Sequence, residues 1–471
     1  MMKMLQIRRI IGLIFLFFLS ATIHGQTVDM IIGEKDAEKA HLCWNPIVAR
    51  VALTEPKNAD VKVTLISSPR TDDRKNGQVV FFAKKNTGKD STSKNFTSSK
   101  SIEIVLPKNG DWVEFLVAGD FGYPSTNPND VRIAVVNGDG IEIGIFNTSV
   151  RVRKNAEKLT STEWQRFINT LAILHDVNND SSNSLYVKYP VVHNAAWNMA
   201  HGGPAFLPWH RAFLLALERE LQVIDSFVTI PYWKFDTASK NIFTLMAMGT
   251  PAGESLDGKV EFSANHPWKN WRVGGTKLVD SRPGNGSQPV GVIPEDLIIG
   301  SNGDYSTLWS NMEGSHHGDA HDRLNGWLAR GISPSDPVFF LIHAQVDRVW
   351  AKWQFNNSLF DPTSSKGYAP LGTWESSGKS RNRPKGHWSN DTMWPWDGDE
   401  SNETQRFSLR DLNWLGHLEE DRIEFPIISN FAPNLSPLVA DMIDYMSFHG
   451  KNKSLGYCYD DVPFRRGKNN D

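Results

Sequence analysis

Cysteine is scarce in this chain: Cys43 and Cys458 are the only two among 471 residues. Cysteines so far apart do not form the closely spaced pairs of a zinc ribbon, so a structural zinc site of that class is excluded. An excess of one charge is also lacking, because 50 basic and 53 acidic residues leave a net charge of −3. This balance indicates no nucleic-acid or membrane-surface partner through bulk electrostatics. The sequence leaves open whether the two cysteines form a disulfide or stay unpaired.

Long apolar runs are missing after residues 1–25, so no membrane-spanning helix is expected. Residues 1–25 have the pattern of a secretory signal peptide, since Lys3, Arg8 and Arg9 precede the apolar segment Ile10–Leu19. The absence of a cysteine near Gly25 argues against a lipid anchor. We therefore expect a soluble mature protein that is secreted or periplasmic.

Residues 27–149 are predicted to form a small all-β, sandwich-like domain. Short β-branched or aromatic runs, most alternating with period two, are separated by Asn-Gly and Asp-Gly turns. The predicted strands are Val61–Ile66, Gln78–Phe82, Ser101–Leu106, Trp112–Val117, Val131–Val136 and Ile141–Phe146. No cluster of metal-ligating residues lies among them, so an accessory module without chemistry of its own is expected.

Residues 150–465 are predicted to form a mainly α domain with long irregular loops. Thr160 and Glu163 have the spacing of a capping box, and apolar residues follow at helical intervals from Trp164 to Leu174. The stretch 236–310 is rich in glycine, proline and asparagine and is expected to be irregular surface.

Three histidines, His193, His201 and His210, stand close together at the start of this helical region. Neutral imidazole is a common ligand of redox metals. His201 and His210 are nine residues apart, which on one continuous helix would place them on opposite faces. A shared metal therefore requires the chain to turn at Gly202-Gly-Pro204, which predicts His201 in a loop and His210 near the start of a helix.

A second set of three histidines, His317, His321 and His343, repeats the count of the first. His317 and His321 are four apart and would share one helix face, although such a pair alone is equally typical of a solvated face. All-imidazole sites with no carboxylate or cysteine in register suit copper or zinc, and three histidines leave metal positions open for reaction. Two adjacent sites of this kind favour a pair of copper ions.

These residues resemble the type-3 copper proteins, the family of tyrosinases, catechol (polyphenol) oxidases and molluscan hemocyanins. The matching segments are Ala200–Arg211, Ile230–Trp233, His317–His321 and Asp336–Trp350. The resemblance extends over residues 151–460 and implies a four-helix bundle around two copper ions, Cu A and Cu B. It also implies that Tyr457-Cys-Tyr459 is the family's closing tyrosine motif and pairs with an arginine, either Arg151 or Arg153.

The resemblance assigns His193, His201 and His210 to Cu A and His317, His321 and His343 to Cu B. The first ligand is the least determined, because its spacing varies within the family and His175 is a rival. His193 is preferred, since Tyr186 lies seven residues before it as in the family's tyrosine-led helix. His193 is followed by Asn-Ala, as in the bacterial form.

Three departures from the family pattern bear on activity. Ile342 stands where many members have a further histidine, and no cysteine lies near the histidines to form the crosslink of some members. Glu313 occupies the position of a glutamate that holds a water in plant-like members. Gly318 follows His317, where efficient monophenol hydroxylases often have asparagine. Without that amide the water is held less firmly as a base for phenol deprotonation, so the resemblance implies oxidation of o-diphenols to o-quinones with weak or no monophenol hydroxylation.

The expected partners are O2 and a phenolic substrate, docked at Cu B near His321 or His343. Phe339 or Phe340 is a candidate gate, although for either one alone a place in the core is the stronger expectation. Asp322, next to His321, could tune the charge preference for substrate or could only solvate its helix.

Several alternatives stay open at this point. They are an o-aminophenol oxidase, a full tyrosinase, a hemocyanin-like oxygen carrier and a binding protein that has lost its metal. Residues 27–149 could shield the copper pocket, as a domain does in latent relatives, or could serve adhesion or stability.

Overall fold

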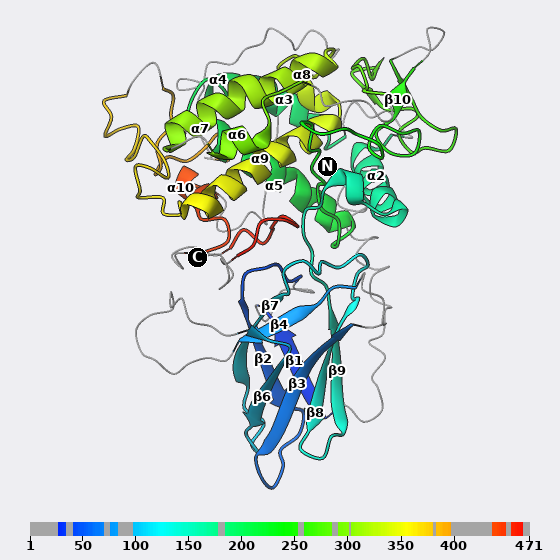
Figure 1. The fold of residues 1–471 in the computed structure, drawn as a ribbon, viewed down its shortest axis with the longest axis vertical. Helices are drawn as coiled ribbons and strands as arrows, with labels where there is room; N and C mark the ends of the chain where they lie inside the picture. Colours follow the sequence, from blue (N-terminus) through cyan, green and yellow to red (C-terminus); the bar gives the residue numbers. More distant parts are fainter. Residues whose placement is uncertain are drawn as a thin grey trace, which may run out of the picture.

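A computed structural model describes residues 27–33, 41–69, 76–82, 98–177, 184–252, 259–284, 291–300, 303–379, 383–396, 436–448 and 454–464. The predicted signal peptide, residues 1–25, lies outside these residues. In Figure 1 a β-sheet part is followed along the chain by a helical part, and the two lie at opposite ends of the long axis.

The β part consists of two antiparallel sheets. One has the strand order β1-β2-β7-β4-β5 and the other β6-β3-β8-β9. The pleat directs alternate side chains inward, so that in β3 Val63 and Leu65 are buried while Lys62 and Ile66 are exposed. The strands are β1 Val28–Ile32, β2 Ile47–Leu53, β3 Val61–Pro69, β4 Val79–Phe82, β5 Ser98–Ser99, β6 Ser101–Leu106, β7 Val113–Gly119, β8 Val131–Asn137 and β9 Glu142–Thr148. All six predicted strands are present, and their ends differ from the predicted ends by at most three residues. Strands β1, β2 and β5 were not predicted.

The helical part is built around two long helices, α5 and α9, which pack against each other. Helix α9 is buried along nearly its whole length, which explains its almost uninterrupted apolar sequence. Helix α2 begins with the predicted capping box between Thr160 and Glu163. The helices are η2 Ala156–Lys158, α2 Ser161–His175, α3 Lys188–Ala195, α4 Trp197–Ala200, α5 Phe206–Ile224, α6 Glu295–Gly300, α7 Tyr305–Asn311, η4 Met312–Gly318, α8 Asp319–Leu324, η5 Ser333–Ser335, α9 Val338–Asn357 and α10 Val439–Ile443. Short strand pairs, β10 Thr250–Pro251 with β11 Val260–Glu261 and β12 Arg272–Val273 with β13 Thr276–Lys277, interrupt the irregular stretch before α6. In the part of the chain that the structure describes, no helix combines the length and apolarity needed to cross a membrane.

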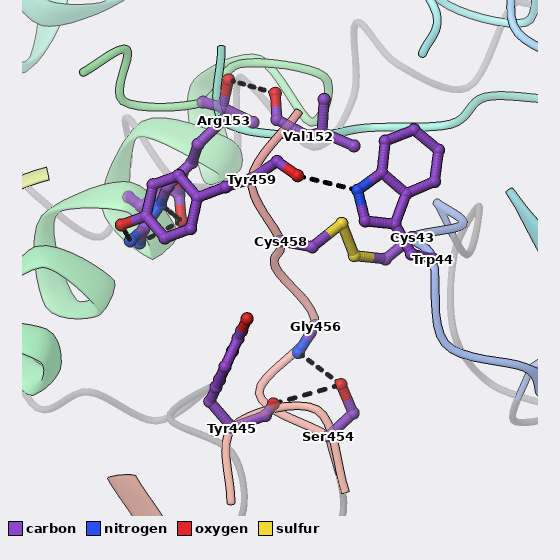
Figure 2. The surroundings of a disulfide bond; sticks show 11 residues. Cys43, Trp44, Val152, Arg153, Tyr445, Ser454, Gly456, Cys458 and Tyr459 are labelled. Carbon is purple, nitrogen blue, oxygen red and sulfur yellow. Dashed lines mark hydrogen bonds and ion pairs between the residues drawn. A yellow bond between two sulfur atoms is a disulfide. The ribbon is translucent and has the colours of Figure 1, made fainter. Parts of the chain in front are cut away.

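The β part and the helical part are joined at the segment that ends the described chain. A disulfide links Cys43 to Cys458, whose Cα atoms are 6.1 Å apart. Trp44, the next residue, donates its indole N–H to the carbonyl of Tyr459 at 2.8 Å, as Figure 2 shows. Of the two possibilities for the cysteines, the structure shows the disulfide.

A buried charge cluster lies directly behind this junction. Arg153 donates to Glu218 at 2.8 Å, to Asp347 at 3.1 Å and to the hydroxyl of Tyr459 at 3.0 Å. Arg211, the residue after His210, donates to the other oxygen of Asp347. The arginine that pairs with the tyrosine motif is thus Arg153. Because Asp347 lies one helical turn after His343 on α9, the cluster connects the C-terminal segment to the helices that carry the histidines.

Candidate metal centre

The first three histidines converge although they lie on different elements. His193 is in α3, His201 follows the end of α4, and His210 is in the second turn of α5. One ring nitrogen of each lies within 4.8 Å of those of the other two. The predicted turn is present, with Gly202 at φ +69°, a conformation that glycine adopts without strain. The loop position of His201 and the helix position of His210 are therefore confirmed.

The second three histidines converge in the same way. His317 is in the last turn of η4, His321 is in α8, and His343 is in the middle of α9. Their ring nitrogens also lie within 4.8 Å of one another. Segment η4 is a π-helix, a local widening that is frequent at functional sites. Helix α8 begins at the residue directly after η4, so the two segments follow each other with no loop between them.

The two sets form one centre. The rings of His210 and His343 are stacked with centroids 4.1 Å apart and an angle of 14°. His201 and His317 also approach across the gap, with centroids 6.5 Å apart. The structure therefore brings together six histidines as two neighbouring groups of three.

Backbone carbonyls orient five of the six rings. In each case Nδ1 lies 2.6–3.3 Å from a carbonyl oxygen, and a carbonyl can only accept, so Nδ1 carries the proton. The other nitrogen, Nε2, is then left as an unprotonated donor for a metal. The pairs are His193 with Gly331, His201 with Trp197, His210 with Phe206, His317 with Glu313 and His321 with Leu328.

The free nitrogens face one another, which fits a bound cation. His343 Nε2 lies 3.1 Å from His317 Nε2 and 3.3 Å from His321 Nε2, and His193 Nε2 lies 3.4 Å from His210 Nε2. Burial lowers the pKa of His193 to about 3 and that of His321 to about 4, so these rings are neutral at physiological pH. Neutral lone pairs that meet in a buried space are unfavourable unless a cation lies between them. The residues present thus fit two soft, imidazole-binding metal ions.

His175, the rival first ligand, lies elsewhere. Its Nδ1 is 3.0 Å from the hydroxyl of Ser184, and its Nε2 is 2.9 Å from the carbonyl of Arg272. Both nitrogens are thus engaged, and the ring packs against Trp271 with centroids 4.0 Å apart. This geometry favours His193 as the first ligand and makes His175 a structural histidine.

Glu313 reaches across from the second set to the loop of the first. Its carboxylate accepts from the backbone N–H of Gly202 at 2.7 Å, next to His201. Burial raises the pKa of Glu313 to about 7. Gly318 ends η4 with ordinary helical torsions, and a Cβ there would lie 3.2 Å from the carbonyl oxygen of Glu313. A side chain at position 318 therefore needs only a small local shift.

Phe339 and Phe340 do not reach the surface. Phe339 is fully buried and packs on His343 with ring centroids 4.1 Å apart, and at 4.9 Å on His193. Phe340 is also fully buried and stacks on Phe213. A gate must border an opening, so we assign both rings to the packing that holds the histidines. Asp322 is exposed on α8.

Trp197 was not singled out from the sequence. Its ring stacks on His201 with centroids 4.1 Å apart and an angle of 23°, and its side chain is 39% exposed. His201 is also the one member of the six that is not fully buried. The spacing of four residues between Trp197 and His201 could have indicated a contact, but only if α4 had been predicted as a helix.

The chain is similar to known proteins in sequence and in fold. The family model for the common central domain of tyrosinase matches residues 162–296 and 291–356. A tyrosinase of Streptomyces antibioticus is 32% identical over 231 residues, which cover 43% of this chain and 82% of that protein. Grixazone synthase of Streptomyces griseus subsp. griseus is 27% identical over 264 residues, covering 44% and 84%. A functional unit of octopus hemocyanin covers 67% of this chain and 69% of its own, with 17% identity and a TM-score of 0.40. From the sequence match to the tyrosinases, together with the two histidine groups, it follows that this chain belongs to the tyrosinase family of copper oxidoreductases.

Proposed function

We propose that the protein is an exported dicopper oxidase that converts o-diphenols to o-quinones, with weak or no action on monophenols. The observation that carries this proposal is the convergence of two groups of three neutral imidazoles in one buried centre. His193, His201 and His210 would hold one copper ion, and His317, His321 and His343 the other. When bound, the two copper ions would supply the electron transfer by which two catechols are oxidised for each O2 reduced to water.

The chain's own residues orient these ligands and admit the substrate. We propose that substrate enters beside His201 and Trp197, because Trp197 is exposed there and His201 is partly exposed. His343 is buried and packed by Phe339 and His210 at 4.1 Å each, so His321 is the better candidate for a contact with the substrate ring. Asp322 is exposed on α8, where its negative charge would favour the approach of a cationic over an anionic substrate.

The preference for o-diphenols rests on Gly318 and Glu313. A monophenol must lose its proton before it is hydroxylated, and a positioned base accelerates such a transfer by about 10²–10⁴-fold. Gly318 has no side chain that could help Glu313 to hold a water for this purpose. One oxygen of the Glu313 carboxylate, Oε1, already accepts from the N–H of Gly202.

Oxygen uptake by copper-loaded protein tests the proposal, with a catechol, a monophenol and an o-aminophenol as parallel substrates. The catechol is expected to react at least about tenfold faster than the monophenol, a difference of about 1.4 kcal/mol in activation free energy. Gly318→Asn is expected to raise the monophenol rate by about tenfold or more. Gly318→Ala adds the same Cβ without the amide and is expected to leave that rate unchanged.

Other outcomes would identify a different function. Equal rates on monophenol and catechol in the unchanged protein would contradict the role given to Gly318 and indicate a full tyrosinase. A faster reaction with o-aminophenol would indicate an oxidase for that ring. Reversible O2 binding without turnover of any of the three substrates would indicate a carrier.

We also propose a two-domain organisation, with residues 27–149 as an accessory domain and 150–465 as a four-helix-bundle core. Export predicts a mature protein that begins near Gln26, which mass spectrometry of the purified chain would detect.

The β part contacts the core at the disulfide, Trp44 and Tyr459, whereas α4 and α8 lie at the far end in Figure 1. We therefore propose that the β part stabilises the core and does not shield the copper pocket.

Removal of residues 27–149 tests this role. The shortened protein is expected to keep its kcat/KM for catechol within about twofold and to unfold at a lower temperature. The full chain with Cys43→Ser and Cys458→Ser is the control for loss of the disulfide alone. A gain in activity of about tenfold or more on truncation would show shielding instead.

A further inference from the structure

One loop provides a hydrogen-bond acceptor for both histidine groups. Residues 325–335, which include η5, form most of the connection between α8 and α9. Within them, the carbonyl of Leu328 accepts from His321 Nδ1 at 2.7 Å, and the carbonyl of Gly331 accepts from His193 Nδ1 at 2.6 Å. These two histidines belong to different groups, so a shift of this loop would reorient one proposed ligand of each copper ion.

A fully buried aspartate holds the loop. Asp280 accepts from the backbone N–H of Leu328 at 2.7 Å. The carbonyl of the same residue, Leu328, orients His321. The two chain segments approach closely here, because a Cβ on Gly326 would lie 2.8 Å from the carboxylate of Asp280. The positive φ of Gly326, +64°, likewise favours glycine. The close approach at Gly326 therefore supports the contact between Asp280 and the loop from the side of the loop as well.

The second oxygen of Asp280 faces another buried carboxylate. Its Oδ2 has no hydrogen-bond donor among the described residues, and the carboxylate of Asp336, which lies beside it, helps to raise the pKa of Asp280. Asp336 pairs with Arg282 at 2.7 Å and accepts from the N–H of Val338 at the start of α9 at 2.9 Å. Tyr186 is the other titratable group nearby, and its hydroxyl donates to the carbonyl of Pro334 at 2.6 Å.

Burial and like charge favour a proton between the two carboxylates. Two ionised aspartates would place two negative charges against the single positive charge of Arg282 in a space with no exposure to water. Asp336 already has two partners, Arg282 and the N–H of Val338, whereas Oδ2 of Asp280 has no donor among the described residues. Burial, and then Asp336, raise the pKa of Asp280 well above its usual value. Asp280 is accordingly the neutral partner and donates to Asp336.

We propose that Asp280, as a neutral acid that accepts from Leu328 and donates to Asp336, is a positioning residue for both copper sites. It fixes the loop 325–335 and thereby the ring orientations of His321 and His193. This inference rests on the assignment of the two histidine groups as metal ligands. Neither Asp280 nor Asp336 belongs to the two groups of histidines that would hold the copper ions.

The test compares Asp280→Asn, Asp280→Ala and Asp336→Asn by the stoichiometry and affinity of copper binding, measured against a competing chelator. Asparagine at 280 keeps the acceptor and replaces the acidic O–H with an N–H donor, so it is expected to bind two copper ions with an affinity within about threefold of the unchanged protein. Alanine at 280 removes both bonds and is expected to weaken copper binding by about 10–100-fold. Asparagine at 336 leaves Arg282 without its charge partner and is expected to weaken binding more than asparagine at 280.

The comparison stays decisive if the alanine variant does not fold. Asparagine is nearly equal in size to aspartate, so the two asparagine variants can still be compared with each other. If Asp280→Asn loses copper affinity as strongly as Asp336→Asn, Asp280 is not the neutral partner and the proposal fails. Unchanged affinity in a folded Asp280→Ala would also overturn it. The readout is copper binding, so a protein that binds two copper ions without oxidising catechol would contradict the proposed function and leave this inference standing.

Discussion

Replacement of His343 with asparagine is expected to reduce copper binding from two ions per chain to one and to abolish oxidation of catechol. His343 Nε2 is the atom that both His317 and His321 approach, at 3.1 and 3.3 Å. The shorter asparagine side chain cannot reach that point from α9, so only two imidazoles would remain for Cu B. Metal analysis of the purified variant and oxygen uptake with catechol would measure the two effects.

His175→Asn is the matched control, because His175 is also a buried histidine of the same domain. Its two ring nitrogens bond to Ser184 and Arg272 and not to the centre. This variant is expected to bind two copper ions and to keep its activity, with some loss of stability. If it lost a copper ion while His193→Asn kept both, the assignment of the first ligand would have to be reversed.

Replacement of Asp347 with asparagine is expected to destabilise the metal-free protein by about 3–5 kcal/mol. Asp347 lies between two fully buried arginines, Arg153 and Arg211, and accepts from both as well as from Tyr459. Removal of one charge from such a cluster leaves buried positive charge without compensation, which costs more than the pair itself contributes. Denaturant unfolding of the metal-free variant would measure the loss.

Glu114→Gln provides a control from the same chain. Glu114 pairs with Arg50 at 3.0 Å, but both side chains are more than a third exposed. Solvent screens such a pair, so its loss is expected to cost less than about 1 kcal/mol. Equal destabilisation by the two substitutions would contradict the view that burial makes the Asp347 cluster important.

Much of the fold and of the metal centre was predictable because residue spacing and side-chain alternation are visible in the local sequence. The turn at Gly202 follows from a nine-residue spacing that no single helix can accommodate. The strands of the second sheet follow from alternating side chains and Asn-Gly turns. Strands β1 and β2 were missed because short apolar runs become strands only when a neighbouring strand is available to pair with them.

The residues that orient the ligands were not predictable from local patterns. The carbonyls of Leu328 and Gly331 carry no side-chain signature, and Asp280 meets the loop from a segment 48 residues earlier in the chain. The choice of Arg153 over Arg151 likewise depends on where the C-terminal segment passes. Such contacts depend on tertiary packing, which leaves no periodic trace in the sequence.

The disulfide between Cys43 and Cys458 has a topological consequence. The two cysteines are 415 positions apart and all six histidines lie between them, so the copper centre lies inside a single covalent ring of polypeptide. A protease that cuts one surface loop within this ring would leave two polypeptides joined by the disulfide. The two would migrate as one molecule until a reductant is added. A nicked enzyme would therefore keep its ligands within reach of each other.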